Sequence, residues 1–469
     1  MKGSKEFLFL ILTCLLFFIL RLPSLFEPLW YGDEGIYQVI GTSLNHGKLL
    51  YKEIFDNKPP LLYWLYSFFH SDQFTIRLAS LIFGMLAVLF FFLLSKKLFK
   101  NRNDIQYLTT FIFAVLFGLP ILEGNIANAE NFMILPILVA ALLVSNFKLF
   151  LAGLFLGVAF LFKIVAIFDF SAFFVFYFIL NFSSLKKEIK LSRIFAGFLL
   201  PIFFTILFFA LKGALPDFIR ATFITNVSYV NYGNKIGSLP LLLFVKLALL
   251  GLFTMYLFTK RKKFSQTLLF VLIWFGFSLF NAFFSERPYI HYLLVLLPSL
   301  SLLVGCILFE KKYQKIIIVF LIMVLIVLSK SFGIPGLSKN ISYYQNFTSY
   351  MSGARSMDSY QAFFDLSTPF DYEIARFIRP KINKNETIFV WGNNAQLYQL
   401  VGVIAPTKYI VAYHITDYKD GGASTKNAID KIKPKFIVVM PNQQIIPFSL
   451  IHYSERIKIN NAIIYERLF

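Results

Sequence analysis

The chain has 469 residues, of which 58% are hydrophobic and only 15% are charged, and its mean hydropathy is +0.68. Soluble domains are about half apolar and about a quarter charged, so this composition excludes a single soluble core. The formal net charge of +20 would suit a nucleic-acid-binding protein, but the positions of the basic residues, described below, argue against that partner. We therefore expect a polytopic α-helical membrane protein.

The first apolar segment covers residues 7–26 and is long enough to cross a bilayer, which takes about 20 apolar residues in a helix. It follows Lys2 and Lys5 in the manner of a signal peptide, but it continues into residues 21–23 without a small-x-small cleavage site. We interpret it as an uncleaved anchor with a cytoplasmic N-terminus.

The first external loop is predicted over residues 27–75 and contains the stretch WYGDEGIYQVI, in which Asp33 and Glu34 are adjacent. One interpretation is that the two acids begin a helix, where they would suit the positive end of the helix dipole. The other is that one carboxylate is a base or a cation ligand at a site reached from the membrane face. The residues alone leave both interpretations open.

The same loop continues into FDNKPPLLYWLYSFF, over residues 55–69. Pro59 and Pro60 predict a stiff turn before an amphipathic aromatic helix, and Lys58 comes immediately before that turn. A lysine at the level of the lipid headgroups would hold the phosphate of a lipid-linked substrate. The alternative is an interfacial anchor with a snorkelling lysine.

Further apolar runs recur to residue 334, and we expect eleven spans in all: 7–26, 76–95, 105–122, 131–147, 149–162, 164–181, 194–211, 239–259, 264–284, 289–309 and 316–334. The links on one side carry the basic clusters: Lys2 and Lys5; Lys96, Lys97, Lys100 and Arg102; Lys148; Lys186, Lys187, Lys190 and Arg193; Lys260 to Lys263; and Lys311, Lys312 and Lys315. This is the positive-inside pattern, so the excess charge indicates topology and no nucleic-acid partner.

One apolar block, residues 149–180, is too long for one span and too short for two ordinary spans. A single crossing would place the cations of residues 186–193 on the outer side. Two short helices that meet near Lys163 keep these cations inside. Totals of ten or twelve spans stay open.

Outside the membrane we expect a second external segment at 212–238 and a polar tail at 335–469. In the tail, ETIFVW, KYIVAY and KFIVVM have the composition of short strands, and a helix is predicted to begin at Thr368. We therefore divide the chain into a transmembrane domain, 1–334, and a small extracytoplasmic α/β domain, 335–469. WGNNAQ lacks the second and third glycines of a dinucleotide-binding loop.

The order of these features resembles the GT-C superfamily of polyprenyl-phosphate-sugar-dependent glycosyltransferases. The similarity is to glycosyltransferase family 39, which includes protein O-mannosyltransferases and lipid A aminoarabinose transferases. The matching stretches are WYGDEGIY, DNKPPLLYWL, NAENFMILP, GVAFLFKIVAIF and ERPYIHYLLVLLPSLSLLVG. The resemblance covers most of the membrane part, and the tail resembles the extracytoplasmic domains of bacterial relatives.

This resemblance implies a GT-C type fold in a bacterial inner membrane, with the active site on the extracytoplasmic side. It implies transfer of a sugar, with inversion, from a polyprenyl phosphate donor, undecaprenyl phosphate in a bacterium, to a lipid, glycan or protein acceptor. The partners are thus the lipid-linked donor, the acceptor and membrane lipid.

The resemblance also implies roles for single residues. Asp33 corresponds to the acid that acts at the acceptor, with Glu34 beside it, and Lys58 corresponds to a ligand of the donor phosphate. Lys163, at the outer end of the short helix pair, is a second candidate for that phosphate. Two further candidates begin the tenth span, Arg287 and His291, although an interfacial hydrogen bond is an equal alternative for the histidine.

The chain departs from the family at one position. Some relatives have an acid directly before the lysine of the KP turn and use it with a histidine to bind a metal, whereas this chain has Asn57 there and Asp56 one residue earlier. Asp56, or Glu130 with His291, would still form a metal site, so a divalent metal cofactor is left open. Glu123 and Glu130 complete the candidate site residues.

The main alternative is a polytopic transporter or flippase of lipid-linked saccharides without transferase activity. Transporters place ionisable substrate ligands within broken helices near the bilayer centre and are built from internal repeats. Here the charged candidates gather at external span ends and no convincing repeat is present, so a transferase is favoured. A scaffold whose tail binds partners would leave the acid pair and Lys58 unexplained.

Overall fold

The computed structural model describes residues 2–182, 188–227, 241–287, 289–334, 336–441, 443 and 446–468. Lys186 and Lys187 of the predicted basic clusters lie outside the described residues, and so do positions 228–238 of the second predicted external segment.

The chain folds into two compact units. The helical unit contains Met1–Pro23, Leu78–Phe208 and Thr222–Ser342, and the mixed unit contains Ser24–Arg77, Phe209–Ala221 and Tyr343–Phe469. The predicted first external loop is thus grouped with the C-terminal residues by its contacts. The expected division into 1–334 and 335–469 follows chain order and stays a prediction.

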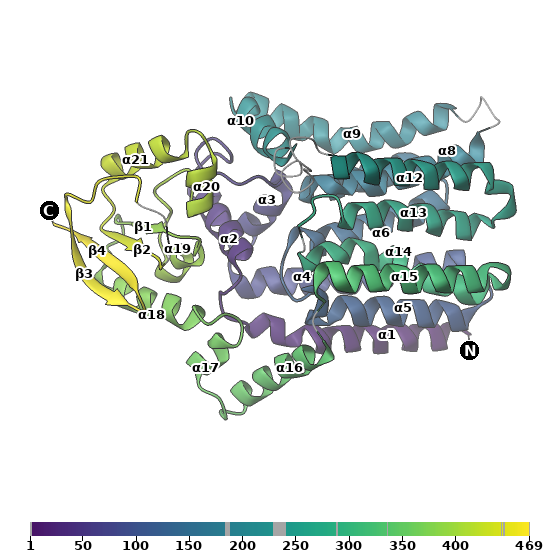
Figure 1. The fold of residues 1–469 in the computed structure, drawn as a ribbon, viewed down its shortest axis with the longest axis horizontal. Coiled ribbons are helices and arrows are strands. Elements are labelled where there is room, and N and C mark those ends of the chain that lie inside the picture. Colours follow the sequence, from purple (N-terminus) through teal and green to yellow (C-terminus); the bar gives the residue numbers. More distant parts are fainter. Residues whose placement is uncertain are drawn as a thin grey trace. The chain divides into compact units, whose positions relative to one another are not determined.

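A helix coincides with each of the eleven predicted spans. The helices are α1 (Lys2–Arg21), α4 (Gln73–Leu98), α5 (Asn103–Gly118), α6 (Ala129–Ser145), α7 (Leu149–Phe162), α8 (Ile167–Asn181), α9 (Glu188–Leu211), α12 (Leu241–Thr259), α13 (Gln266–Ala282), α14 (Leu297–Phe309) and α15 (Gln314–Phe332). Helix α13 packs against α8, α12 and α14, and α5 packs against α1 and α14 (Figure 1).

The lengths of these helices confirm a polytopic membrane protein but do not give its span count. Among the described residues, seven helical segments are long and apolar enough to cross a bilayer. Helices α6, α7 and α13 are apolar but shorter. The number eleven therefore stays a prediction.

The break predicted near Lys163 is confirmed. Helix α7 ends at Phe162, Lys163 has an extended backbone with φ −155° and ψ 129°, and a short 3₁₀ turn, Ile164–Ala166, leads into α8. Glycines let α7 approach α9 closely, because a Cβ atom at Gly153 would lie 2.0 Å from the carbonyl oxygen of Ile194. Two short helices therefore replace one long span.

The mixed unit contains a four-stranded sheet with strand order β1-β2-β4-β3. Its strands are β1 (Ile388–Trp391), β2 (Phe436–Val439), β3 (Tyr453–Ile459) and β4 (Ala462–Arg467). Strands β1 and β2 pair in parallel, and β4 pairs antiparallel with both β2 and β3. The predictions for ETIFVW and KFIVVM are thus confirmed.

One strand prediction is wrong and one hairpin was missed. In KYIVAY, residues 408–411 are not in a strand and Ala412 begins a helix. The Ala412 amide donates to the carbonyl of Gly392, which follows β1, and not to a residue of a strand. The missed hairpin joins β3 to β4 through Asn460 and Asn461, which both have positive φ. Two consecutive asparagines between apolar alternating runs are typical of such a turn.

The helices of the mixed unit are mostly short. They are α2 (Gly32–Asn45), α3 (Pro60–Phe68), α10 (Leu215–Ile219), α16 (Leu337–Met351, from Tyr343 onward), α17 (Met357–Ala362), α18 (Thr368–Ile378), α19 (Gln396–Val401), α20 (Ala412–Asp417) and α21 (Gly421–Ile432). The helix expected from Thr368 is α18. The loop 48–56 lies against the segment before α20, since the Phe55 amide donates to the Lys408 carbonyl at 3.0 Å.

A buried carboxyl group joins α18 to the segment after β1. Asp371 is fully buried and accepts hydrogen bonds from Asn394 Nδ2, at 3.0 Å to each oxygen, and from Gln396 Nε2 at 2.8 Å. Burial raises the pKa of Asp371 to about 6, although both hydrogen bonds oppose that rise. The folded protein therefore favours the neutral acid more than the unfolded chain does.

We expect this group to make the protein less stable as the pH rises. In the unfolded chain the carboxyl ionises at a lower pH than in the folded protein, where burial opposes the charge. Between about pH 4.5 and pH 7 this difference should lower the unfolding free energy by roughly 2 kcal/mol. In Asp371→Asn this part of the pH dependence should disappear, as measured by pulse proteolysis of the full chain in detergent. Asp358→Asn, at an exposed acid of the same unit, is the control. Equal pH dependence in wild type and Asp371→Asn would contradict the prediction.

Candidate functional site

The predicted acid pair lies in the first turn of α2, so the helix start expected there is confirmed, and the role of a carboxylate as base or cation ligand stays a prediction. The two carboxylates face different surroundings. The side chain of Asp33 is 36% exposed, whereas that of Glu34 is 3% exposed. Adjacent residues of a helix point about 100° apart, which explains why one acid is buried and the other is accessible.

Glu34 belongs to a buried ion-pair network. Arg77 Nε donates to Glu34 Oε1 at 3.2 Å and Arg77 Nη2 donates to Glu34 Oε2 at 2.5 Å. The same guanidinium lies 3.1 Å from Glu27 Oε2 and donates to the carbonyl of Ser24 at 2.7 Å. Tyr343 donates to the other oxygen of Glu27 at 2.5 Å. These contacts favour a structural role for Glu34, because both of its oxygens bind the arginine.

Asp33 instead contacts the lysine that the sequence singled out. Lys58 Nζ lies 3.4 Å from Asp33 Oδ2, and the Tyr37 hydroxyl donates to the same oxygen at 3.0 Å. The lysine also lies 4.9 Å from the centroid of the Tyr37 ring, which adds a cation–π contact. Two stretches that are 25 residues apart therefore bring a carboxylate and a cation together at an accessible position.

Asp56 lies on the buried side of Lys58. Its side chain is 3% exposed and its Oδ2 atom is 3.8 Å from Lys58 Nζ. Tyr63 donates a hydrogen bond to the same oxygen at 2.6 Å. Burial, and then the charge of Asp56, raises the pKa of Tyr63 well above its usual range, so the phenol keeps the proton it donates.

A histidine from the C-terminal segment completes this group, although no motif in the sequence pointed to it. His414, in α20, is 3% exposed, and its Nε2 atom lies 3.7 Å from Asp56 Oδ1. Burial lowers the pKa of His414 to about 4, despite the nearby Asp56 charge, so the ring is neutral at pH 7. Among the described residues its Nδ1 atom has no hydrogen-bond partner. We call Asp33, Asp56, Lys58 and His414 the loop cluster.

Four other predicted site residues meet within the helical unit, and we call Glu123, Glu130, Lys163 and His291 the helical cluster. Lys163 forms an ion pair with Glu130, at the first turn of α6, and lies 4.3 Å from the centroid of the Tyr292 ring. Both partners are largely buried, with side-chain exposures of 14% and 3%. The extended backbone at Lys163 places its side chain at the α7–α8 break.

His291 joins the two acids of the helical cluster. It lies in the 3₁₀ turn Ile290–Leu296, which leads into α14. Its Nδ1 atom is 2.8 Å from Glu123 Oε2 and its Nε2 atom is 3.9 Å from Glu130 Oε1. Glu123 has a left-handed backbone with φ 58°, an uncommon conformation for a residue other than glycine. Such strain is typical of functional positions.

Arg287 is the remaining predicted ligand. It is half-buried in the segment between α13 and the turn that carries His291. The residue before it, Glu286, forms an ion pair with Lys246 of α12.

The side chains of both clusters are of types that can bind metal ions, so they bear on whether the protein holds a divalent metal. Carboxylate and imidazole groups suit a divalent cation. However, nowhere in the described part of the chain are three or more His, Cys, Asp or Glu side chains arranged to hold a metal ion. In the structure, the acids of both clusters contact lysine and histidine side chains instead.

Comparisons with known proteins support the fold. No protein-family model matches the chain, and no curated protein matches it. Among solved structures, the chain is similar to ArnT from Cupriavidus metallidurans bound to undecaprenyl phosphate, with 13% identity and a TM-score of 0.57, over 99% of this chain and 98% of that one.

A further match is the apo oligosaccharyltransferase from Archaeoglobus fulgidus, with 12% identity and a TM-score of 0.48, over 92% of this chain and 69% of that one. The same protein tethered to an acceptor peptide gives 13% identity and a TM-score of 0.45. The full-length similarity to ArnT shows that this multi-pass membrane protein has the GT-C type fold, with a small C-terminal α/β region.

Proposed function

We propose that this protein is a membrane glycosyltransferase that moves a sugar from a polyprenyl-phosphate-linked donor to an extracytoplasmic acceptor, with inversion. The observation that carries the proposal is the contact between Asp33 and Lys58, since it joins an accessible base to a cation in the loop that the family motifs predicted. The end-to-end similarity to a protein solved with undecaprenyl phosphate supports the class of donor.

The proposed reaction needs one proton acceptor and one anion ligand. The acceptor's hydroxyl or amine attacks the anomeric carbon, a new bond to that carbon forms, and the bond from the carbon to the phosphate oxygen breaks. The acceptor's proton passes to Asp33, and the electron pair of the broken bond stays on the polyprenyl phosphate. Lys58 stabilises the negative charge that develops on this leaving group.

The other residues of the loop cluster position these two. Asp56 is buried, accepts a hydrogen bond from Tyr63 and lies 3.8 Å from Lys58 Nζ, so it helps to hold the lysine beside Asp33. His414 is neutral and lies against Asp56, so it limits the movement of that carboxylate without adding a charge.

The helical cluster supplies further candidates for the phosphate. Lys163 and His291 are the phosphate-ligand candidates that the sequence selected there, with Arg287 nearby in the chain, and Glu123 and Glu130 contact the first two. We propose a bacterial inner membrane, a cytoplasmic N-terminus and extracytoplasmic C-terminal residues, because this orientation places the basic links inside.

Transfer from a labelled donor tests the proposal. Membranes that contain the wild-type chain should move radiolabelled sugar from a polyprenyl phosphate sugar pool into an acceptor fraction. Lys58→Gln should lower kcat/KM about 100- to 1,000-fold, because one preorganised cation at the leaving phosphate is lost. Lys52→Gln, which removes an exposed lysine of the same loop, is the matched control. Wild-type membranes that move the labelled lipid across the bilayer without sugar transfer would indicate a transporter instead.

A further inference from the structure

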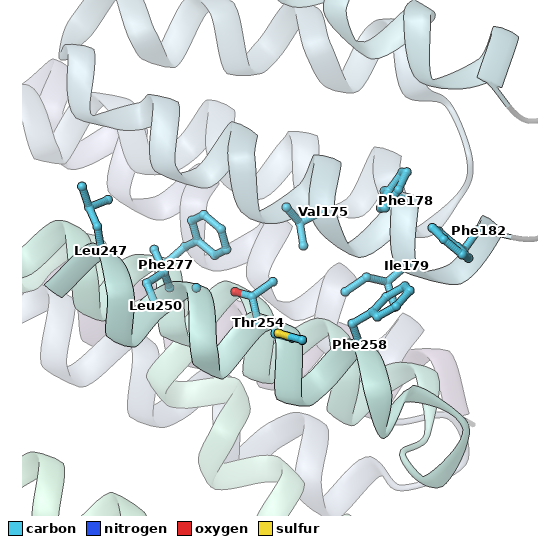
Figure 2. Close-up of a pocket in the computed structure, with 11 residues that line it drawn as sticks. Val175, Phe178, Ile179, Phe182, Leu247, Leu250, Thr254, Phe258 and Phe277 are labelled. Atoms are coloured by element: carbon cyan, nitrogen blue, oxygen red, sulfur yellow. The ribbon is translucent and has the colours of Figure 1, made fainter. Parts of the chain in front are cut away.

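An apolar groove runs between α8, α12 and α13 in the helical unit. Its volume is about 610 Å³, within the usual size range of small-molecule sites. Figure 2 shows Leu247 and Phe277 toward one end, Phe182 and Phe258 toward the other, and the hydroxyl of Thr254 between them. The lining is otherwise aliphatic or aromatic, so the shape and chemistry suit a hydrocarbon chain.

The groove lies on the most exposed of the candidate membrane spans. Only 6% of the apolar window of α12 is buried, compared with 22% to 67% for the other six candidate spans among the described residues. In a bilayer this surface meets lipid, since apolar helix faces of that length are buried in the hydrocarbon.

Positive charge marks one end of the groove. The guanidinium of Arg261 lies 4.3 Å from the centroid of the Phe258 ring and 5.7 Å from that of Phe182, and both rings line the groove. Its Nη1 atom donates to the Phe258 carbonyl at 2.8 Å, which holds the arginine at this position. Lys260, Lys262 and Lys263 flank it and are exposed.

We propose that this groove binds an anionic phospholipid, with an acyl chain along α12 and the phosphate against Arg261 and the flanking lysines. The combination of an apolar channel between helices and a cationic end is the arrangement that recognises anionic lipid headgroups. The site does not depend on sugar transfer.

The position of the charged end separates this lipid from the proposed donor. Phe182 follows the C-terminal end of α8, whereas Lys163 precedes its N-terminal end, so the two groups lie at opposite ends of one helix. The sequence also places the link 260–263 on the cytoplasmic side, opposite the proposed phosphate ligands.

Lipid retention by the purified full chain tests the proposal. Native mass spectrometry would compare dioleoylphosphatidylglycerol with dioleoylphosphatidylcholine, and we expect selective retention of the first. Arg261→Gln should weaken phosphatidylglycerol binding about fivefold, the usual contribution of one cation near a phosphate surface. Adding Lys262→Gln to this variant should weaken the binding further. Lys100→Gln, at an exposed lysine in another link, should leave binding unchanged.

A second variant tests the apolar part. A Cβ atom at Gly251, which lines the groove, would meet no atom within 4 Å, so a larger side chain fits there without a clash. Gly251→Phe should fill the groove and abolish retention of dioleoylphosphatidylglycerol, whereas Gly251→Ala should keep it.

Three results would overturn the proposal. They are equal retention of the two lipids by the wild type, unchanged selectivity in Arg261→Gln, and displacement of the phosphatidylglycerol by an equimolar amount of undecaprenyl phosphate. The last result would assign the groove to the donor chain.

Discussion

Replacement of Asp33 by Asn is expected to reduce sugar transfer about 100- to 10,000-fold while the protein stays folded. The side chain is partly exposed, its contacts are with Lys58 and Tyr37, and asparagine has nearly the same shape but does not accept a proton at neutral pH. The loss should appear in kcat more than in KM, because the proton is accepted only as the acceptor attacks. Initial rates with a labelled polyprenyl phosphate sugar measure both constants.

Two controls separate a base from a structural acid. Glu53→Gln removes an exposed carboxylate of the same loop and should leave transfer unchanged. If Asp33→Asn also transfers at the wild-type rate, Asp33 only begins α2, and the proposed mechanism fails at its first step. The pH–rate profile gives a further test. If the wild-type rate falls at acidic pH and the residual rate of Asp33→Asn does not, the result supports a base.

Replacement of Arg77 by Met is expected to cost about 3–5 kcal/mol of unfolding free energy, which is a large part of the total stability of a protein. The guanidinium is fully buried, and its removal leaves Glu27 and Glu34 buried without their cation. Most of the protein should then be degraded or aggregate. The yield of monodisperse protein in detergent, and its thermal unfolding, measure this effect.

The reason for that loss of stability can be tested by also removing the two carboxylates that lose their cation. Adding Glu27→Gln and Glu34→Gln to Arg77→Met should recover part of the stability, because the amides are cheaper to bury than unpaired carboxylates. Arg102→Met is the control, since this arginine pairs with Asp104 at an exposed position and should matter little. An Arg77→Met protein as stable as wild type would contradict this account of the network.

Much of the candidate site was predictable because its residues stand out in a chain with few charges. Asp33 and Lys58 could be found as polar residues in an aromatic external loop, and Lys163 as a cation between two short apolar runs. The structure also separates neighbours that the sequence treats alike, since Glu34 is buried against Arg77 whereas Asp33 is accessible. That difference depends on which side of α2 packs against Arg77.

Other parts of the site had no local signal. His414 directly follows KYIVAY, a stretch predicted as a strand, and it reaches Asp56 only because the loop 48–56 lies against the chain before α20. Arg77 lies at the start of the predicted span 76–95, and no sequence motif assigned it a role. Both contacts join residues far apart in sequence, and hydropathy and spacing contain no information about such pairs.

The sequence by itself determined the membrane class, the positions of the apolar helices, the break at Lys163 and the candidate residues, because apolar length, proline and scarce charge act locally along the chain. Only the tertiary structure decided which acid is accessible, which cation each acid pairs with, and that a C-terminal histidine joins the loop cluster. The physical reason is that pairing and burial depend on packing between distant segments, and the low dielectric of that packing makes each choice of partner energetically large.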